Sequence, residues 1–461
     1  MEVRDVSAID LRASERRATA LNHTEVGPLP LDWRVKSLRE CATHITDGEH
    51  LTPIRADAGY YLLSARNVLN GKLNLVDVDY VGDKEYSRIR KRCNPESGDI
   101  LLSCSGTIGR VAIVPVGFEC VLVRSVALIK PNEGALDGAY CQYFLQSLAG
   151  QVQIFSSLNQ GAQPNLFLNH IEALKIAIPP TVVEQKAIAE ALSDADALIE
   201  SLSLLLVKKR QIKQGVMQQL LTGRKRLPGF RDHWPEKSLG ELFQFSGGLS
   251  ASRDQLSTSG HLYLHYGDIH TSTRSFIEVA DQGSSMPRLD IPLGKVQPAS
   301  LLADGDVVFV DASEDDDGVS KHVVVVNPDE APFIAGLHTI VAKQKRKELS
   351  STYLRYCFQT QAVKEQFKFY AVGTKVSGIS KKNIAKITLP IPTCEEQSAI
   401  AELLVSIDTD IDALEMKLSK ARELKQAMMQ ELLTGRIRLL QGSSNVDPLP
   451  VKPAADKPSF A

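Results

Sequence analysis

Two long stretches of the chain carry apolar residues at alternating intervals of three and four positions. The apolar positions include Ile188, Leu192, Ala195, Ile199, Leu202 and Leu206 in the first stretch and Ile400, Leu404, Ile407, Ile411, Leu414 and Leu418 in the second. This spacing repeats every 3.5 residues on average and predicts a helix that buries one narrow stripe against a partner helix. Lysines interrupt the stripes at Lys209, Lys213 and Lys425. A helix from Glu184 to Leu221 would be roughly 55 Å long, at about 1.5 Å per residue.

The two stretches are copies of one another. Residues 184–227 and 396–439 align without a gap at an offset of 212 positions, and just over half of the aligned pairs are identical. Each copy follows an Ile-Pro sequence, at Ile178 and Ile391, and ends in Leu-Thr-Gly, at Leu221 and Leu433. Proline ends the preceding element, and glycine is the usual residue after a helix. Two helices of equal length in one chain favour mutual pairing as a coiled coil; the alternative is that each packs on its own domain.

Two segments of similar size, residues 31–180 and 228–392, accompany the predicted helices. Each begins with a tryptophan followed by Lys-Ser-Leu, at Trp33 and Trp234, and each later has Gly-Asp before an apolar strand, at Gly98 and Gly305. Short β-branched runs separated by Gly, Asn and Asp are typical of mixed α+β modules. The predicted order is an extension 1–30, a first module 31–180, a helix 181–227, a second module 228–392, a helix 393–440 and a tail 441–461. This tail is rich in Pro and Ser and is expected to be disordered.

Composition restricts the class of protein without indicating a function. The chain has 461 residues, of which 43% are hydrophobic and 23% charged, which is typical of a soluble globular protein. It has no apolar run near the roughly 20 residues that span a bilayer and no apolar signal core, so we expect it in the cytoplasm. Seven cysteines without a Cys-x-x-Cys pair favour reduced, mostly buried thiols over a zinc or disulfide framework. A net charge of −2 neither indicates nor excludes nucleic-acid binding, because a local groove can be basic.

The order module, helix, module, helix, with Glu-Gln-x-x-Ile-Ala at the start of each helix and Leu-Leu-Thr-Gly-Arg at its end, resembles the specificity subunit of type I restriction-modification enzymes. The resemblance covers about Leu31 to Leu440. Inside the modules, residues 46–53, 103–114, 159–166, 266–269, 335–341 and 373–380 resemble patches of target recognition domains. The resemblance implies an α+β fold in which two mixed α/β target recognition domains are separated by two long helices that pair as an antiparallel coiled coil.

The resemblance also implies a non-catalytic, sequence-specific DNA-binding subunit that reads an asymmetric bipartite target, with one recognition domain per half-site and the helix pair setting the gap. The implied partners are double-stranded DNA, two methyltransferase (modification) subunits and endonuclease/translocase (restriction) subunits. S-adenosylmethionine, ATP and Mg are expected on those partners and no cofactor or metal on this chain, which has neither a G-x-x-x-x-G-K-[ST] loop nor an Asn/Asp-Pro-Pro-aromatic stretch. Two alternatives stay open: the recognition subunit of a related type II-like modification system, and a coiled-coil scaffold whose modules bind protein.

Candidate DNA-binding residues follow from the chemistry of readout, because donors and acceptors read base edges while Arg and Lys mainly bind phosphate. In the first module they are Asp47, His50, Thr52, Arg66, Arg88, Arg90, Lys91, Arg92, Arg110, Asn159, Gln160 and Gln163, and in the second Arg253, His270, Arg274, Lys321 and Lys375. A solvated turn is an alternative for residues 88–92, and helix capping for the three amides of residues 159–163. His338 lies in an apolar stretch and is predicted to pack in the core. The acidic run 314–318 is predicted to be a solvated turn.

The near identity of the two helix ends offers two equivalent sites to two copies of one partner. We therefore predict methyltransferase docking at Leu220, Leu221, Thr222, Gly223 and Arg224 and at Leu432, Leu433, Thr434, Gly435 and Arg436. The alternative is that these residues only cap and pack the helices.

Overall fold

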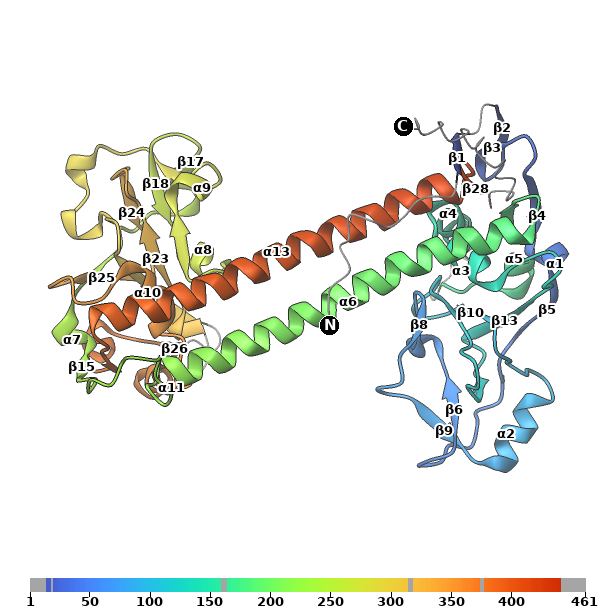
Figure 1. Ribbon diagram of the computed structural model, residues 1–461, viewed down its shortest axis with the longest axis horizontal. Coiled ribbons are helices and arrows are strands. Elements are labelled where there is room, and N and C mark those ends of the chain that lie inside the picture. Colours follow the sequence, from blue (N-terminus) through green and yellow to red (C-terminus); the bar gives the residue numbers. More distant parts are fainter. Residues whose placement is uncertain (1–13, 18–19, 159–163, 314–317, 374–376, 441–461) are drawn as a thin grey trace, which may run out of the picture. The chain divides into compact units, whose positions relative to one another are not determined.

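Two helices of equal length, α6 (Val182–Leu220) and α13 (Cys394–Leu432), dominate the computed structural model, which describes residues 14–17, 20–158, 164–313, 318–373 and 377–440 (Figure 1). The chain divides into two units. The first comprises residues 1–201 and 417–461, and the second comprises residues 202–416. Each unit therefore contains one module, part of α6 and part of α13. The candidates Asn159, Gln160, Gln163 and Lys375, the acids 314–317 and the tail 441–461 lie outside the described residues.

The first module is built on two sheets. Its main sheet is antiparallel and has the order β11 (Val111–Ile113), β10 (Ile100–Ser103), β13 (Val126–Pro131) and β5 (Ala42–Asp47). Its second sheet has the order β12 (Cys120–Leu122), β6 (Tyr60–Leu63) and β9 (Asp79–Val81), with β12 parallel to β6. A separate strand pair, β4 (Arg34–Ser37) with β14 (Lys175–Ile178), joins the beginning of the module to its end.

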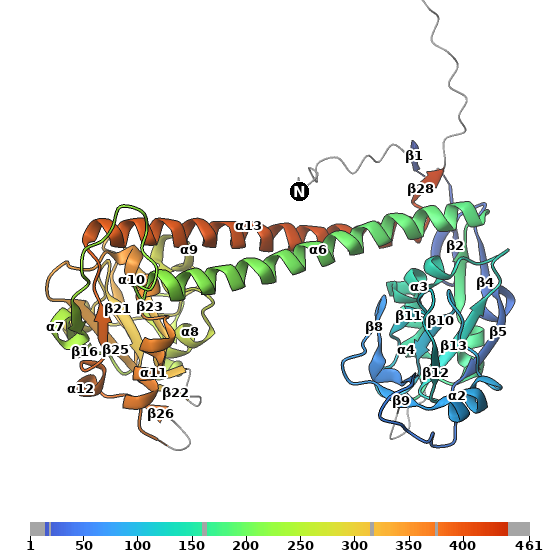
Figure 2. The ribbon, with the colours of Figure 1, turned by 60° about the horizontal axis from the view of Figure 1, so that its bottom comes forward.

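The second module repeats this framework. Its main sheet has the order β16 (Phe243–Gly247), β25 (Thr339–Gln344), β21 (Val307–Val310), β23 (His322–Val326) and β19 (Phe276–Glu278), so its first four strands correspond to β5, β13, β10 and β11. Its second sheet has the order β17 (Leu256–Ser257), β20 (Arg288–Leu289), β18 (His261–Leu264) and β24 (Phe333–Ala335), with β18 parallel to β24. Strands β15 (Glu236–Ser238) and β27 (Thr388–Pro390) close it. Figure 2 shows β10 beside β13 and β21 beside β25.

Short helices and strands complete the modules. The first adds α1 (Leu38–Cys41), a 3₁₀ helix (Ala65–Asn67), β7 (Val68–Leu69), β8 (Lys72–Leu73), α2 (Asp83–Arg90), α3 (Gly138–Gln146), α4 (Leu148–Ser156) and α5 (Leu168–Ala173). The second adds α7 (Leu239–Leu242), α8 (Tyr266–Thr271), α9 (Val279–Gln282), β22 (Ala312–Ser313), α10 (Ser351–Cys357), α11 (Gln361–Tyr370), β26 (Ser377–Gly378) and α12 (Lys381–Ile384). Its 3₁₀ helices are Arg253–Gln255, Leu293–Lys295, Pro298–Ser300 and Gly318–Ser320.

The N-terminal extension contains β1 (Ser14–Arg17) and the hairpin β2 (Leu21–Thr24) and β3 (Gly27–Pro30). Strand β1 pairs antiparallel with β28 (Ile437–Leu440), which follows α13. The first unit therefore holds its helix end and its module start together by strand pairing, whereas in the second unit one continuous loop joins them.

Ion pairs show that α6 and α13 pair antiparallel within each unit. In the first unit Lys425 donates to Asp196 at 2.6 Å, and Glu184 accepts from Arg438, just beyond α13. Residue numbers thus rise along α6 as they fall along α13. In the second unit Lys213 lies 2.5 Å from Asp408. The lysines that interrupt the apolar stripes therefore meet carboxylates on the facing helix, which satisfies their charge.

Each helix pair also packs on its own module. Ile188 and Leu192 belong to the core of the first module, and Ile400 and Leu404 to the core of the second. The two packing modes that the sequence left open therefore occur together. Six cysteines are buried and Cys394 is exposed, which confirms the prediction of mostly buried thiols. None of the helices in the described ranges combines the length and the apolar character needed to cross a bilayer.

Candidate nucleic-acid interface

The two modules expose an equivalent edge, where the ends of two strands meet the start of a third. In the first module β5 and β10 end where β13 begins, and in the second β16 and β21 end where β25 begins. We call this the loop edge. Gly48 and Gly248 follow β5 and β16, and a Cβ at Gly48 would lie 2.4 Å from the Leu122 backbone. Only glycine allows the chains to approach this closely, so the loops at this edge are held tightly.

Three of the predicted residues of the first module meet at its loop edge. The Asp47 carboxylate lies 2.6 Å from His50 Nε2 and 2.6 Å from Arg92 Nη2. The carboxylate oxygens accept from Arg92 and from His50 Nε2–H, and Arg92 Nη2 also lies 3.0 Å from His50 Nε2. The carboxylate is 16% exposed, whereas His50 and Arg92 are about half exposed. Asp47 therefore orients two groups that face solvent.

Arg88, on α2, pairs with a carboxylate of the same loop. Its guanidinium pairs with Glu49 and Glu85, each at 2.9 Å. Burial alone would raise the pKa of Glu49, but the Leu51 N–H and the charge of Arg88 hold this pKa below its usual value. Arg88 thus neutralises a buried carboxylate and supports the loop that carries His50.

The other candidates of the first module do not join this group. Arg66 pairs with Asp77 and Asp79, and Arg90 contacts Asn94, the Tyr86 hydroxyl and the Tyr86 ring. Thr52 and Lys91 are exposed, and Arg110 is half-buried.

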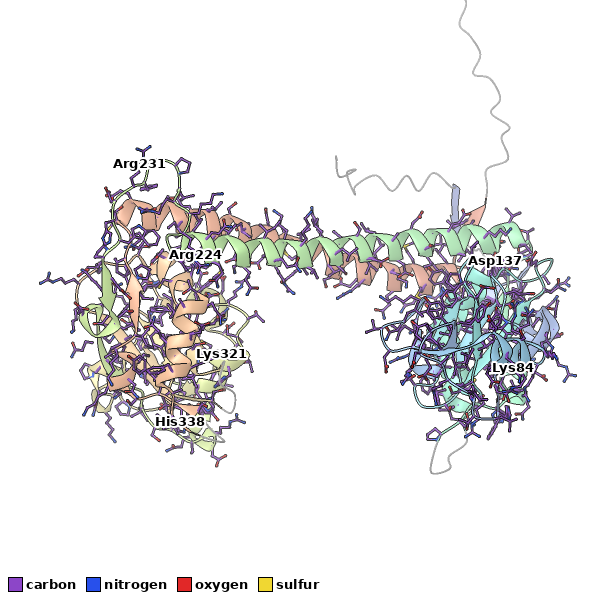
Figure 3. All side chains as sticks on the ribbon, turned by 90° about the horizontal axis from the view of Figure 1, so that it is seen from below. Lys84, Asp137, Arg224, Arg231, Lys321 and His338 are labelled. Carbon is purple, nitrogen blue, oxygen red and sulfur yellow. The ribbon has the colours of Figure 1, made fainter. Side chains whose placement is uncertain are left out.

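At the loop edge of the second module lies His338, and the prediction that it packs in the core is wrong. Its side chain is 50% exposed, and Nδ1 lies 3.2 Å from Asp311 Oδ1. The residue occupies the turn between β24 and β25 with a φ of 58°. An apolar stretch can contain a tight turn, and the turn directs the imidazole outward (Figure 3).

A basic cavity of about 720 Å³ lies between the second module and the helices of its own unit. Three acidic side chains line it, Asp408, Asp412 and Glu415, against six cationic ones: Arg210, Lys213, Arg274, Lys321, Arg355 and Lys364. The three acids pair with Lys213, Arg274 and Arg210, respectively. Among the described residues no acidic side chain pairs with Lys321, Arg355 or Lys364, and these three positive charges make the cavity suitable for an anion.

Of the predicted residues of the second module, Arg274 and Lys321 line this cavity. Lys321 Nζ donates to the His270 carbonyl at 2.8 Å, which brings His270 beside them. Arg253 is exposed and does not line this cavity.

The helix ends are largely explained by packing. Leu220 and Leu221 are buried in the second core, and Leu432 and Leu433 in the first. Gly223 and Gly435 have φ values of 68° and 66°, as a helix terminator requires. Thr222 and Thr434 bond the helix carbonyls of Gln218 and Gln430. Arg224 and Arg436 remain exposed, so the docking prediction now depends mainly on these two side chains.

Comparison with known proteins assigns the family. The model described as type I restriction modification DNA specificity domain matches residues 30–208 and 231–423. The chain belongs to this family. It is 25% identical over 392 residues to the type I restriction enzyme MjaVIII specificity subunit of Methanocaldococcus jannaschii, covering 80% of this chain and 87% of that protein. It is 23% identical over 455 residues to the EcoKI specificity subunit of Escherichia coli, covering 91% and 92%.

The fold agrees with the family. The type I restriction-modification S subunit from M. genitalium superposes with a TM-score of 0.53 at 17% identity, covering 90% of this chain and 98% of that chain. Each family match contains one module and most of the helix that follows it. The chain is thus a type I specificity subunit with two target recognition domains, the first and second modules, and the antiparallel helix pair that the sequence predicted.

Sequence reasoning missed Asp311, His338, Arg355 and Lys364. Aligning the two modules would have found His338, because Val-Arg-Ser at residues 123–125 and Gly-Leu-His at residues 336–338 occupy the same turn. Arg355 and Lys364 lie on helices, where nothing in the sequence marks the face that lines the cavity.

Proposed function

We propose that this specificity subunit reads an asymmetric bipartite DNA sequence and directs methylation and restriction by partner subunits to it. Each target recognition domain would read one half-site, and the helix pair would fix the number of base pairs between them. The observation that carries the proposal is the loop edge: two domains with one framework present different polar groups there, Asp47, His50 and Arg92 in the first and Asp311 and His338 in the second. Different readers on one framework suit a target with two different halves.

The basic cavity supports affinity for DNA without sequence information. In the part of the chain that the structure describes, no acid pairs with Lys321, Arg355 or Lys364. Phosphate oxygens are the anions that such groups bind on a duplex. We place these side chains on the DNA backbone and the loop-edge side chains on the bases.

Catalysis would come from the partners. Two methyltransferase subunits would supply S-adenosylmethionine chemistry, and restriction subunits would supply ATP- and Mg-dependent translocation and cleavage, all in the cytoplasm. The equivalent ends of α6 and α13 would dock the two methyltransferase subunits through Arg224 and Arg436. A related type II-like modification system would use the same reading surfaces with another effector.

The direct experiment is genome-wide mapping of methylated adenine in cells that express the cognate methyltransferase subunit with or without this chain. We expect methylation at one split, asymmetric sequence only when the chain is present. Methylation that is the same in both cells, although the two proteins form a complex, would contradict the proposal and favour a scaffold.

Docking is tested on the purified complex by native mass spectrometry. Replacing both Arg224 and Arg436 with Ala should reduce the number of bound methyltransferase subunits, and either single change should affect one of the two. Arg231→Ala is the matched control, because Figure 3 shows Arg231 in the loop that follows Arg224 and it is also exposed. Two bound subunits in the double variant would remove these arginines from the interface.

A further inference from the structure

The turn that carries His338 is held in one conformation. His338 and Glu330, with φ values of 58° and 51°, are the non-glycine residues with positive φ in the described part of the chain. The His338 carbonyl accepts from the Asp311 N–H at 3.2 Å, and the Leu337 N–H donates to the Tyr263 hydroxyl at 2.9 Å. A strained backbone conformation that the surroundings maintain is characteristic of functional sites.

The imidazole itself is also fixed. The Tyr266 ring stands edge-on to it, at 5.5 Å between centroids and 86° between planes. Because a carboxylate only accepts, Nδ1–H donates to Asp311, and in the neutral imidazole Nε2 carries a lone pair. Asp311 is 34% exposed and has a second oxygen, which also accepts. The pair therefore presents hydrogen-bond acceptors to solvent at a fixed position.

A pair of hydrogen-bond acceptors can distinguish the bases by the edges that they display in the major groove. Cytosine displays its N4 amino donor, whereas guanine presents N7 and O6, thymine presents O4, and adenine places the acceptor N7 beside its amino group. Two neighbouring acceptors attract the cytosine amino group and are repelled by the acceptor atoms of the other bases.

We propose that Asp311 and His338 are base-reading residues of the second target recognition domain and that they read the cytosine of a C·G pair. The inference rests on the proposed function and names the readers within it. Figure 3 shows His338 on the surface of the module remote from the helices of its unit, where a duplex edge can reach it.

The first domain supports this reading by contrast. There Asp47 is only 16% exposed and both of its oxygens are occupied, by His50 and Arg92, so the exposed groups include the remaining N–H donors of the Arg92 guanidinium. Guanidinium donors favour guanine O6 and N7. The two loop edges thus offer opposite hydrogen-bonding character from the same place in the fold.

The experiment compares methylation patterns of wild-type, His338→Gly, Asp311→Asn and Glu330→Gly chains, each with the cognate methyltransferase subunit. Glycine relieves the positive φ at both positions, so neither glycine variant should lose stability, and urea unfolding verifies this. Glu330→Gly makes the same backbone change in the turn between β23 and β24 and serves as the control.

We expect His338→Gly and Asp311→Asn to relax one position of one half-site, a C·G pair, with roughly a tenfold to hundredfold loss of discrimination. Glu330→Gly should leave the pattern unchanged. An unchanged pattern in both reader variants, a relaxed A·T pair, or equal changes in both half-sites would overturn the inference while the proposed function stands. A wild-type chain that produces no split pattern would overturn both.

Discussion

The two halves of this specificity subunit are nearly identical where a module meets the helices and different where a module meets solvent at its loop edge. Tyr143 donates to Asp196 at 2.9 Å in the first half, and Tyr356 donates to Asp408 at 2.7 Å in the second. Each of these aspartates also binds a lysine of the facing helix, Lys425 or Lys213. The offset of 212 positions between the helix copies maps one set of helix residues onto the other.

The loop edges do not correspond in this way. The turn that holds His338 in the second module holds Ser125 in the first. Asp47 is the last residue of β5, whereas Asp311 follows β21, which corresponds to β10. Both junctions, the surfaces where a module meets the helices, must fit the same pair of helices, and this requirement fixes their side chains. The named polar groups of each loop edge pair with one another, so they can differ as their targets differ.

One difference within the junctions predicts the largest effect. Glu396 is 1% exposed and accepts from Arg226 and, at 2.8 Å, from Trp234 Nε1. Its counterpart Glu184 accepts from Arg438, and Arg438 also pairs with a second carboxylate, Asp32, at 3.0 Å. Trp33 Nε1, which corresponds to Trp234 Nε1, has no hydrogen-bond partner among the described residues.

We expect Glu396→Ala to lower the free energy of unfolding by about 3–5 kcal/mol, as for a broken buried ion pair, and Glu184→Ala to lower it by less. Urea unfolding followed by tryptophan fluorescence measures this. The chain has two tryptophans, one per unit, so Trp33→Phe leaves a reporter of the second unit and Trp234→Phe a reporter of the first. A larger loss for Glu184→Ala would refute the stated asymmetry.

The buried His322 predicts an acid-sensitive second unit. It pairs with Phe309 across the sheet, where the first module has Val111 opposite Leu102. Burial lowers the pKa of His322 to about 4. The hydrogen bond to the Ser320 carbonyl raises this pKa, and the charge of Lys364 lowers it to a smaller degree.

The unfolded chain protonates this ring below about pH 6.5 and the folded chain does not, so stability should fall as the pH drops from about 6.5 to 4. We expect His322→Val to remove about 3 kcal/mol of this loss. Urea unfolding at pH 7 and at pH 4.5 tests it, with Val111→Ala, a cavity in the matching position, as a control whose cost does not depend on pH. Equal acid sensitivity of wild-type and His322→Val would contradict the assignment.

The helix terminators should respond unequally to alanine. A Cβ at Gly435 would lie 2.7 Å from Pro30, whereas one at Gly223 would lie 3.2 Å from the Trp234 ring. The left-handed conformation alone costs alanine about 1 kcal/mol, so we expect about that loss for Gly223→Ala and a larger one for Gly435→Ala. The same fluorescence measurement gives both values, and equal losses would mean that the Pro30 contact relaxes freely.

The sequence predicted the repeated architecture because long helices can be recognised from their local apolar periodicity and from the glycines at their ends. The charged interruptions at Lys213 and Lys425 were visible too, but their partners Asp408 and Asp196 depend on the register of two distant segments. Asp47, His50 and Arg92, named as candidates from the sequence, lie at the loop edge of the first module, whereas Asp311 and His338 at that of the second were not named. The type of turn before β25, not the polarity of its neighbours, decides whether His338 faces the core or solvent.

The most direct test of the account is to replace residues 234–391 with a second copy of residues 33–178 and to map methylated adenine with the cognate methyltransferase subunit. Because the two junctions are equivalent, the exchanged chain should fold and bind its partners. The account predicts a split target that carries the half-site of the first domain on both sides of the gap. An asymmetric target that still contains the half-site of the second domain would contradict the assignment of one half-site to each domain.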